Sequence, residues 1–251
     1  MKKMKSFLTI KITSVCLFVL AGILFTSCKK DFLDRKPLGQ YNEDDLNSGS
    51  LEGLVFATYA GLRHDGLSGL AYISVHNMRA DDADKGSSPG DGVDAEDVFD
   101  NFNYSKDHWI INEYWAGQYN LSASANTVIA TADSIGGTDP ATQVNIGEAK
   151  FFRALAYFNL VRTFGEVPLI DFRITEASQA VKAKSSIAEI YALIDSDLEF
   201  AASVLPQGKD WDGKYPGRLS KGAANALQAK TFLARQQWGQ ALSAAQQVIQ
   251  S

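Results

Sequence analysis

The residue with the most definite chemistry is Cys28, which ends an apolar run and follows the small residues Thr26 and Ser27. Two small residues before a cysteine are typical of a bacterial lipoprotein signal, in which lipid is attached to the thiol and the cysteine becomes the new N-terminus. Phe25 departs from the Leu or Val that is usual at its position. Because several acyl chains anchor a protein stably, we predict lipidation at Cys28 and a lipoprotein signal peptide over 1–27.

The segment ahead of Cys28 has the layout of a secretory signal, with four lysines before or at the start of an apolar run at 12–25. A helix of that length rises only about 21 Å, less than the ~30 Å hydrocarbon core, so cleavage after export is favoured over a permanent span. An ordinary signal peptide with a chance cysteine is the alternative. Cleavage would remove Cys16 and leave no thiol for a disulfide, a metal site or nucleophilic catalysis.

Carboxylates offer a second possible chemistry, since eight acidic residues lie between Asp81 and Asp100. Such groups can bind calcium or, as a pair at fixed separation, hydrolyse a glycosidic bond. The spacing forms no complete EF-hand loop, and an irregular loop fixes no separation, so a solvated surface is the favoured interpretation. Calcium binding is a minor alternative, and we predict no metal site. His64, His76 and His108 are scattered, and no zinc, nucleophile-elbow or phosphate-loop motif gives an enzyme much support.

Composition and charge exclude other classes of protein. With 45% hydrophobic and 11% aromatic residues the chain can build a core without cross-links. Its net charge is −5, and removal of 1–27 takes away four lysines, leaving 20 basic against 29 acidic residues, or −9. Such a domain repels nucleic acid and anionic lipid headgroups, so we predict no nucleic-acid partner.

Hydrophobic periodicity predicts an all-α fold. The expected helices cover about 50–64, 108–134, 141–164, 187–205, 220–236 and 238–251. Irregular segments rich in Gly, Pro and polar residues separate them at 65–107, 165–185 and 206–219. Within the first of these, AYISVHNMRA is expected to be a short helical or extended piece. Residues 28–49 are polar and turn-rich and are predicted to be a tether to a domain at 50–251.

Polar residues on these helices have expected structural roles. Ser50 is a candidate cap of the first helix, and Ser186 with Glu189 forms a capping box, in which each side chain satisfies a backbone donor. Glu148 and Arg153 are expected to hold neighbouring loops by hydrogen bonds.

The last two helices carry a repeat pattern. Small and aromatic residues recur at spacings that let two helices approach closely, as in a tetratricopeptide repeat: Ala229, Phe232, Ala241, Ala245 and Val248. Ala154 and Tyr157 repeat the first step. Because the segment at 165–185 breaks the period, we predict degenerate tetratricopeptide-like helical hairpins with long irregular loops; coincidence in Ala-rich helices is the alternative. The pattern stops at residue 251 without a helix stop signal, so we expect a domain that is incomplete at its C-terminus.

The stretch EAKFFRALAYFNLVRTFGEVPLI at 148–170 resembles the SusD/RagB family of outer-membrane nutrient-binding lipoproteins. The order of the other segments is also similar to that family: Cys28, then DFLDRKPLGQY, WAGQYNLSASANTVI, the central block and SKGAANALQAKTFLA. The resemblance covers the whole mature chain but only the N-terminal part of the family. It implies a tetratricopeptide-like scaffold, with much of the ligand face in a later region.

The resemblance also implies a function. The family binds a glycan or a similar oligomer at the cell surface and delivers it to a SusC-like TonB-dependent transporter, without catalysis and without a cofactor. Aromatic rings would stack on sugar faces, and carboxylate, amide and Arg groups would bind hydroxyls. The expected partners are therefore that transporter, an oligosaccharide or polysaccharide, and the outer membrane, through lipid on Cys28.

Loops near the family's ligand give four candidate residues in this chain, Arg79, Asp81, Asn101 and Trp109, with Trp109 as a stacking platform. The alternative is that Trp109 packs at the start of its helix and Arg79 pairs with a neighbouring acid.

The remaining aromatic residues divide into two groups. Trp211 and Tyr215 lie in a Gly-containing loop and are candidates for contact with ligand or transporter, or for covering the end of the repeat. Trp115 and Tyr119 fall on the buried face of the second long helix and are assigned to the core.

Two other functions compete with glycan binding. A tetratricopeptide-like envelope adaptor would bind protein partners in a regular superhelical groove, whereas a glycan-binding protein interrupts its repeats with aromatic-bearing loops. The segments at 65–107 and 206–219 favour the glycan-binding protein. A lipid-anchored hydrolase is the third hypothesis, and it would have to turn over a polysaccharide.

Overall fold

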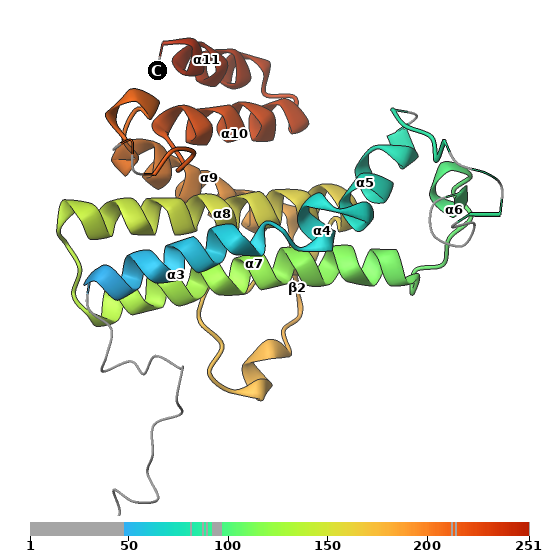
Figure 1. Ribbon diagram of the computed structural model, residues 1–251, viewed down its shortest axis with the longest axis horizontal. Coiled ribbons are helices and arrows are strands. Elements are labelled where there is room, and N and C mark those ends of the chain that lie inside the picture. The colour runs from blue at the N-terminus through green and yellow to red at the C-terminus, as the bar shows by residue number, and fades with distance from the viewer. Residues whose placement is uncertain are drawn as a thin grey trace, which may run out of the picture. The chain divides into compact units, whose positions relative to one another are not determined.

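The computed structural model describes residues 48–80, 82–86, 88, 90–91, 97–211, 213 and 215–250, with side chains from Leu51 onward. The predicted signal peptide, the lipidation site Cys28, nearly all of the tether and Asp81 lie outside these residues. The described chain is mostly helical, with one short two-stranded ribbon, which confirms the predicted all-α class (Figure 1).

Two long antiparallel helices form the centre of the fold, α7 (Trp109–Ser134) and α8 (Pro140–Phe164). The side chain of His108 accepts a hydrogen bond at the start of α7, and Asp139 caps α8 by accepting from two backbone amides. Gly165 ends α8 with φ 72°, a value that favours glycine. The hairpin of α7 and α8 therefore has defined ends, and other helices of the fold pack against it.

The first described helix, α3 (Ser48–Gly61), packs along α7 and α8 (Figure 1). Its predicted limits were wrong at both ends. Ser50 lies inside the helix and is not its cap. The chain turns after Gly61, and His64 instead caps the short helix α4 (Asp65–Ser68), where its Nδ1 accepts from the Gly66 amide at 3.1 Å. The His64 imidazole thus marks the start of α4, which the spacing of apolar residues does not indicate.

The segment 65–107 contains more helix than its breakers predict. After α4 come α5 (Leu70–His76), the 3₁₀ turn η2 (Met78–Ala80) and α6 (Asp97–Asp100). Gly66 allows α4 to approach α7 closely, because a Cβ there would lie 2.3 Å from the carbonyl oxygen of Glu113. Gln118 of α7 donates to the Gly66 carbonyl at 3.0 Å. These contacts hold the segment against the first half of α7.

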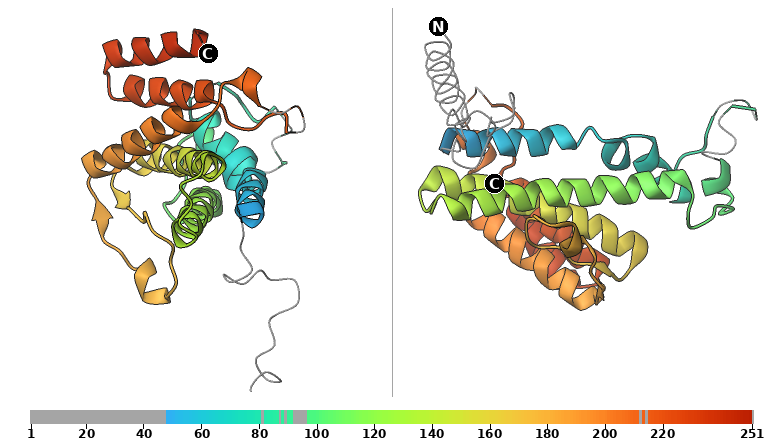
Figure 2. Two further views of the ribbon diagram at one scale, coloured as in Figure 1. Left: turned by 90° about the vertical axis from the view of Figure 1, so that its left-hand side faces the viewer. Right: turned by 90° about the horizontal axis from the view of Figure 1, so that it is seen from below.

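A second layer begins with α9 (Ile187–Val204), which packs against α8. Figure 2 shows α3 in blue and α9 in orange on opposite sides of the α7–α8 hairpin. The capping box of Ser186 and Glu189 is present, as predicted. The 3₁₀ turn η4 (Gly208–Asp210) follows, and the layer ends with the hairpin of α10 (Lys221–Ala234) and α11 (Trp238–Ile249).

The repeat contacts differ from the predicted ones in α11. Ala241 is buried as expected. The second buried alanine of α11 is Ala244, whereas Ala245 is exposed. The reason is that α11 packs chiefly against α10, so only one narrow face is covered. The other face presents Trp238, Leu242 and Ile249, which are 61%, 61% and 85% exposed.

Between α8 and α9 the chain makes a small two-stranded ribbon. Strand β1 (Val167–Pro168) pairs antiparallel with β2 (Lys184–Ser185), and the 3₁₀ turn η3 (Ala177–Ala180) lies in the connection. Figure 1 shows this connection extending away from the helices.

The hydrophobic core has two parts. The larger one joins α3, α7, α8, α9 and α10, and its large fully buried side chains include Tyr157, Phe152, Phe158, Leu160 and Ile194. The smaller one lies under α5 and α6 and contains Ala71, Val75, Met78, Phe99, Ile110 and Tyr114. In the part of the chain with assigned structure, no helix has the length and hydrophobicity needed to span a bilayer.

Candidate functional site

Three of the predicted ligand residues lie in one region, the corner formed by η2, α6 and the start of α7. Trp109 is the first residue of α7; its ring is 51% exposed and lies 6.1 Å from the His108 ring in a stacked arrangement. The guanidinium of Arg79 lies 5.6 Å from the centre of the Tyr104 ring. Asn101 follows α6, and its amide donates to the Asp97 carbonyl at 2.8 Å. The corner therefore offers a half-exposed indole, and Arg79 places a cation elsewhere in the same region.

Sequence reasoning missed Phe102, which belongs to the same corner. Its side chain is 60% exposed, and its backbone has φ 54°, in the left-handed region where a bulky residue is uncommon. Such a conformation has a cost on the order of 1 kcal/mol or more and persists only where neighbours fix it. The only signal in the sequence is an aromatic residue between two asparagines in a turn.

A cluster of polar rings lies behind this corner. The Nε2 atom of His76 is 2.8 Å from the Tyr114 hydroxyl, which also contacts Thr163 at 3.3 Å. Burial, with help from the charges of Arg162 and Arg79, lowers the pKa of His76 to about 4, and burial raises the pKa of Tyr114 to about 12. Both rings are neutral at pH 7, and they support the smaller core.

Trp211 and Tyr215 lie elsewhere, around the guanidinium of Arg218. Trp211 donates from its indole to the Leu219 carbonyl at 2.9 Å, and the Arg218 guanidinium lies 4.3 Å from the centre of its ring. Tyr215 lies 5.3 Å from Phe56 of α3 and 5.7 Å from the same guanidinium. Arg218 thus occupies a ring face that a ligand would need, and this arrangement favours the structural role for both aromatic residues.

Arg218 is held by two acids that the local sequence does not indicate, one buried and one partly exposed. It forms ion pairs with Glu148, which is fully buried, and with Glu52 at 2.5 Å. Glu148 also accepts from the Tyr59 hydroxyl, and burial, together with the charge and hydrogen bond of Glu148, raises the pKa of that phenol. The expectation that Glu148 holds a loop agrees with these contacts.

The two groups of predicted residues are not brought together. Arg218 contacts Asn145 and Glu148 near the beginning of α8, whereas the rings behind the corner contact Asn159 and Thr163 near its end. About 14 residues of helix, or roughly 20 Å, separate these positions.

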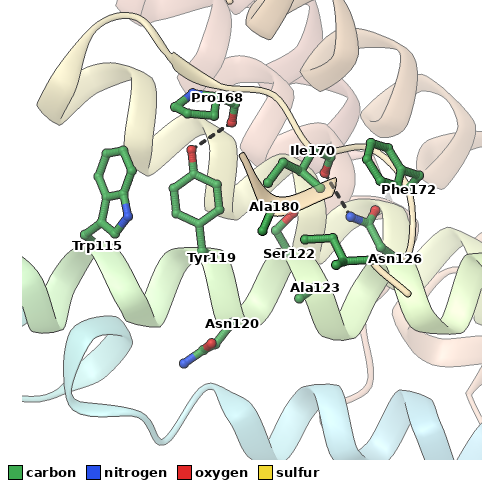
Figure 3. Close-up of a pocket in the computed structure, with 11 residues that line it drawn as sticks. Trp115, Tyr119, Asn120, Ser122, Ala123, Asn126, Pro168, Ile170, Phe172 and Ala180 are labelled. Carbon is green, nitrogen blue, oxygen red and sulfur yellow. Dashed lines mark hydrogen bonds between the residues drawn. The ribbon is translucent and has the colours of Figure 1, made fainter. Parts of the chain in front are cut away.

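A pocket of about 350 Å³ lies between α7 and the segment after β1. Figure 3 shows Trp115 and Tyr119 pointing toward the chain that carries Pro168, whereas Asn120 points away from it. The assignment of Trp115 and Tyr119 to the core was therefore incomplete: both are half-buried, and both line this pocket. This face of α7 is covered by an irregular segment rather than by a helix, which leaves space beside the rings.

The wall opposite α7 is fixed by side chains of the hairpin. Tyr119 donates to the Pro168 carbonyl at 2.7 Å, and Asn126 donates to the Ile170 carbonyl at 2.8 Å. The Tyr157 hydroxyl contacts both the amide and the carbonyl of Ile170, at 2.6 and 3.1 Å.

Arg153 completes this support, in agreement with its expected role. It donates to the Asp171 carbonyl at 2.9 Å and to the Asn126 side chain at 2.8 Å. Its guanidinium also pairs with the fully buried Asp197 through two bonds of 2.7 and 2.9 Å. Bidentate geometry of this kind fixes orientation as well as charge.

Among the described residues no group of three or more His, Cys, Asp or Glu side chains could hold a metal ion. Part of the acidic stretch at 81–100 is not described, so the minor alternative of calcium binding there is not tested.

Comparison with known proteins assigns the family. Residues 31–233 match the SusD-like model described as starch-binding and associating with the outer membrane. The chain belongs to the SusD-like family. A SusD-like protein of Formosa agariphila is 28% identical over 92% of this chain and 45% of its own length, and one of Bacteroides ovatus is 28% identical over 86% and 38%.

Solved SusD-like structures share the fold. A laminarin-binding SusD-like protein superposes with a TM-score of 0.68 at 25% identity, over 80% of this chain and 43% of its own. A structure with xylogluco-oligosaccharide superposes with a TM-score of 0.63 at 25% identity, over 79% and 39%. The chain therefore spans less than half the length of these relatives.

Proposed function

We propose that this SusD-like chain is a cell-surface lipoprotein that binds a glycan or related oligomeric nutrient and passes it to a SusC-like TonB-dependent outer-membrane transporter. Lipid on Cys28 anchors it to the outer membrane. The binding step needs neither catalysis nor a cofactor. Family membership and the carbohydrate ligands of two structural relatives support this function.

The observation that carries the proposal is the exposed indole of Trp109. A sugar ring presents C–H groups on one face, and an aromatic ring that is fixed at a helix start provides a flat apolar partner for them. Arg79 and Asn101 supply donors on the neighbouring turns, and Asp81 is the fourth proposed contact. The Arg79 Nε atom is buried and has no hydrogen-bond partner among the residues with assigned positions. A ligand hydroxyl or a shift of the loop would satisfy it.

The interrupted repeats support glycan binding over the adaptor function. A protein-binding adaptor relies on regularly stacked helix pairs that form a continuous groove. Here the ribbon of β1 and β2 is inserted between α8 and α9 in the sequence, and the corner at η2 and α6 adds aromatic groups beside the hairpin. Trp211 and Tyr215 remain proposed contacts for the transporter or ligand. The competing role is structural, because both rings pack around the Arg218 guanidinium.

Affinity electrophoresis tests this function directly. The purified full-length chain is run in gels that contain laminarin, xyloglucan or starch, and binding retards its migration relative to an unrelated protein of similar size. We expect retardation by at least one glycan and co-purification of a TonB-dependent transporter from the native membrane. The absence of both results would contradict the proposal, and release of reducing sugar from a glycan would replace it with the hydrolase hypothesis.

A further inference from the structure

A polar cavity of about 480 Å³ lies among α9, α10 and α11. Helix α10 packs against both of the others, and Figure 1 shows it between them. The volume is within the range for ligand pockets. Polar side chains from all three helices line the cavity, and they include Glu199, Lys221, Asn225, Gln228, Gln240 and Gln247. None of them belongs to the corner near Trp109 or to the cluster around Arg218, so the proposed function gives this cavity no role.

Asn225 of α10 is a buried amide that lacks partners. The residue is 1% exposed, and neither its Nδ2 nor its Oδ1 atom has a hydrogen-bond partner among the residues with assigned positions. An unpaired buried amide costs free energy, and native proteins rarely keep one unless water or a ligand supplies the missing bonds. A single group that satisfies both atoms must accept from Nδ2 and donate to Oδ1. A hydroxyl does both, whereas a carboxylate only accepts and an ammonium only donates.

Three glutamines of the lining can bind the same kind of group. Gln228, Gln240 and Gln247 form no side-chain hydrogen bond within the described part of the chain. Neither amide atom of Asn225 is open to bulk solvent, so a ligand reaches them as the glutamines move, and these have no side-chain hydrogen bond to break. Phe232 adds a half-buried ring to the lining. Several amides beside one apolar ring suit a sugar, which presents hydroxyls and C–H groups together.

The charges of the cavity favour a neutral ligand. Asp195 is occupied, because Arg235 donates to its two carboxylate oxygens at 2.7 and 2.6 Å. The other charged residues of the lining are Glu199 and Lys221, which are opposite in sign and exposed. A charged ligand therefore gains no net attraction from the lining, and it loses hydration when it enters. An uncharged hydroxyl loses less hydration and finds amide partners.

We propose that the cavity among α9, α10 and α11 is a second saccharide-binding site, which holds a neutral sugar unit through the amides of Asn225, Gln228 and Gln247. Hydroxyl groups of the sugar accept from Asn225 Nδ2 and donate to its Oδ1. This inference rests on the proposed function, because it gives the same class of ligand a second contact. Two sites on one chain hold a polymer more tightly than either site alone when both are occupied together.

An NMR titration tests the cavity separately from the corner. In the spectrum of the isotope-labelled full-length chain, the side-chain amides of Asn225 and Gln247 report on the cavity, and the indole of Trp109 reports on the corner. Gln246 is the internal control, because it adjoins Gln247 on α11 but does not line the cavity. Oligosaccharides of laminarin, xyloglucan and starch are the probes. We expect at least one of them to shift the Asn225 and Gln247 signals with a common Kd and to leave Gln246 in place.

The outcomes separate this inference from the proposed function. A shift of the Trp109 indole without a shift of the Asn225 amide overturns the second site and leaves the proposed function intact. A shift of Asn225 without one of Trp109 supports the cavity and contradicts the role of Trp109. If none of the three probes shifts Asn225, the inference is wrong. Tighter binding of an oligogalacturonate than of every neutral probe, measured at Gln247, would contradict the neutral class of ligand.

A pair of matched variants locates the sugar. Gln247→Ala removes an amide from the lining, whereas Gln246→Ala removes the same group from the neighbouring position outside it. We expect the Kd measured at the Asn225 signal to rise about threefold in Gln247→Ala and to change less than about twofold in Gln246→Ala. Equal Kd values in the two variants would refute the proposed location.

Asn225→Leu tests the buried amide itself, because it keeps the size of the side chain and removes both polar atoms. We expect the Kd measured at the Gln247 signal to rise about tenfold, with the titration of the Trp109 indole unchanged. The Tm should not fall, since an amide without partners adds nothing to the stability of the free protein. A lower Tm together with an unchanged Kd would show that Asn225 serves the fold and would overturn its role in binding.

Discussion

At the scale of single residues, the fold depends on two arginines that bring distant segments together. Arg153 joins α8 to Asp197 of α9, and Arg218 joins the end of the 206–219 segment to Glu148 of α8. Both acids are fully buried, so each must remain paired to avoid an uncompensated charge. Removing one partner is therefore much more damaging than the strength of a salt bridge alone suggests.

Arg218→Met is expected to lower the free energy of unfolding by about 3–5 kcal/mol, because the buried Glu148 carboxylate loses its cation and retains the hydrogen bond from the Tyr59 hydroxyl. Urea unfolding followed by circular dichroism measures it. The control is Arg235→Met, which breaks a pair with the more exposed Asp195 and should change the stability by about 1 kcal/mol or less. Similar losses in both variants would show that burial of Glu148 is unimportant.

His76 gives the fold a dependence on pH. Its pKa falls to about 4 in the folded state from an ordinary value of 6.5, so the unfolded chain binds more protons between these values. Its contribution to stability is complete above pH 6.5 and decreases as the pH falls toward 4, by on the order of 2 kcal/mol after allowance for solvent. Thermal unfolding of wild type and His76→Gln across this range measures it. A constant difference in Tm between the two proteins would contradict the assignment.

At the scale of elements, periodicity predicts the long helices because their apolar residues face one continuous core. The capping box of α9 could be identified because Ser186 and Glu189 are local to each other. The end of α3 could not be identified from the sequence, because the start of α4 depends on the His64 side chain and on the close packing of Gly66 against α7. The ion pairs of Arg218 could not be predicted from the sequence either, since its partner Glu52 is 166 residues away along the chain.

The same reasoning explains the errors in the candidate site. Helical spacing places Trp115 and Tyr119 on a face that meets the rest of the protein, but it does not say whether a helix or an irregular segment covers that face. Here the segment after β1 covers it and leaves a pocket. Trp109 and Arg79 came from family resemblance, and the structure places them in one corner with Phe102, which had no signal of its own.

The segment between α8 and α9 should lose order when its side-chain support is removed. Tyr157→Phe deletes the hydroxyl that contacts both the amide and the carbonyl of Ile170. We expect faster hydrogen exchange of amides near Ile170, with α7 and α8 still protected. Tyr191→Phe, which removes a hydroxyl from α9, serves as the control. Unchanged exchange in Tyr157→Phe would mean that the other contacts fix the segment alone.

At the scale of the whole molecule, the proposed function requires a lipid anchor at Cys28 and a helical domain whose residues bind the glycan. Cys28→Ala is expected to move the protein from the membrane fraction to the soluble fraction, because the multiple acyl chains that give stable anchoring are lost. Cys16→Ala, within the predicted signal peptide, should leave anchoring intact. Membrane fractionation with an immunoblot measures both, and retention of Cys28→Ala in the membrane would contradict lipidation at that residue.

The central claim is that the indole of Trp109 binds a sugar face. The most direct measurement is the Kd for the glycan that retards the wild-type protein, determined by calorimetry for Trp109→Ala and Trp238→Ala. Both rings are more than half exposed, but Trp238 lies on α11. We predict about tenfold weaker binding, or ~1.4 kcal/mol, for Trp109→Ala and no change for Trp238→Ala. Equal affinities in the two variants would contradict the claim.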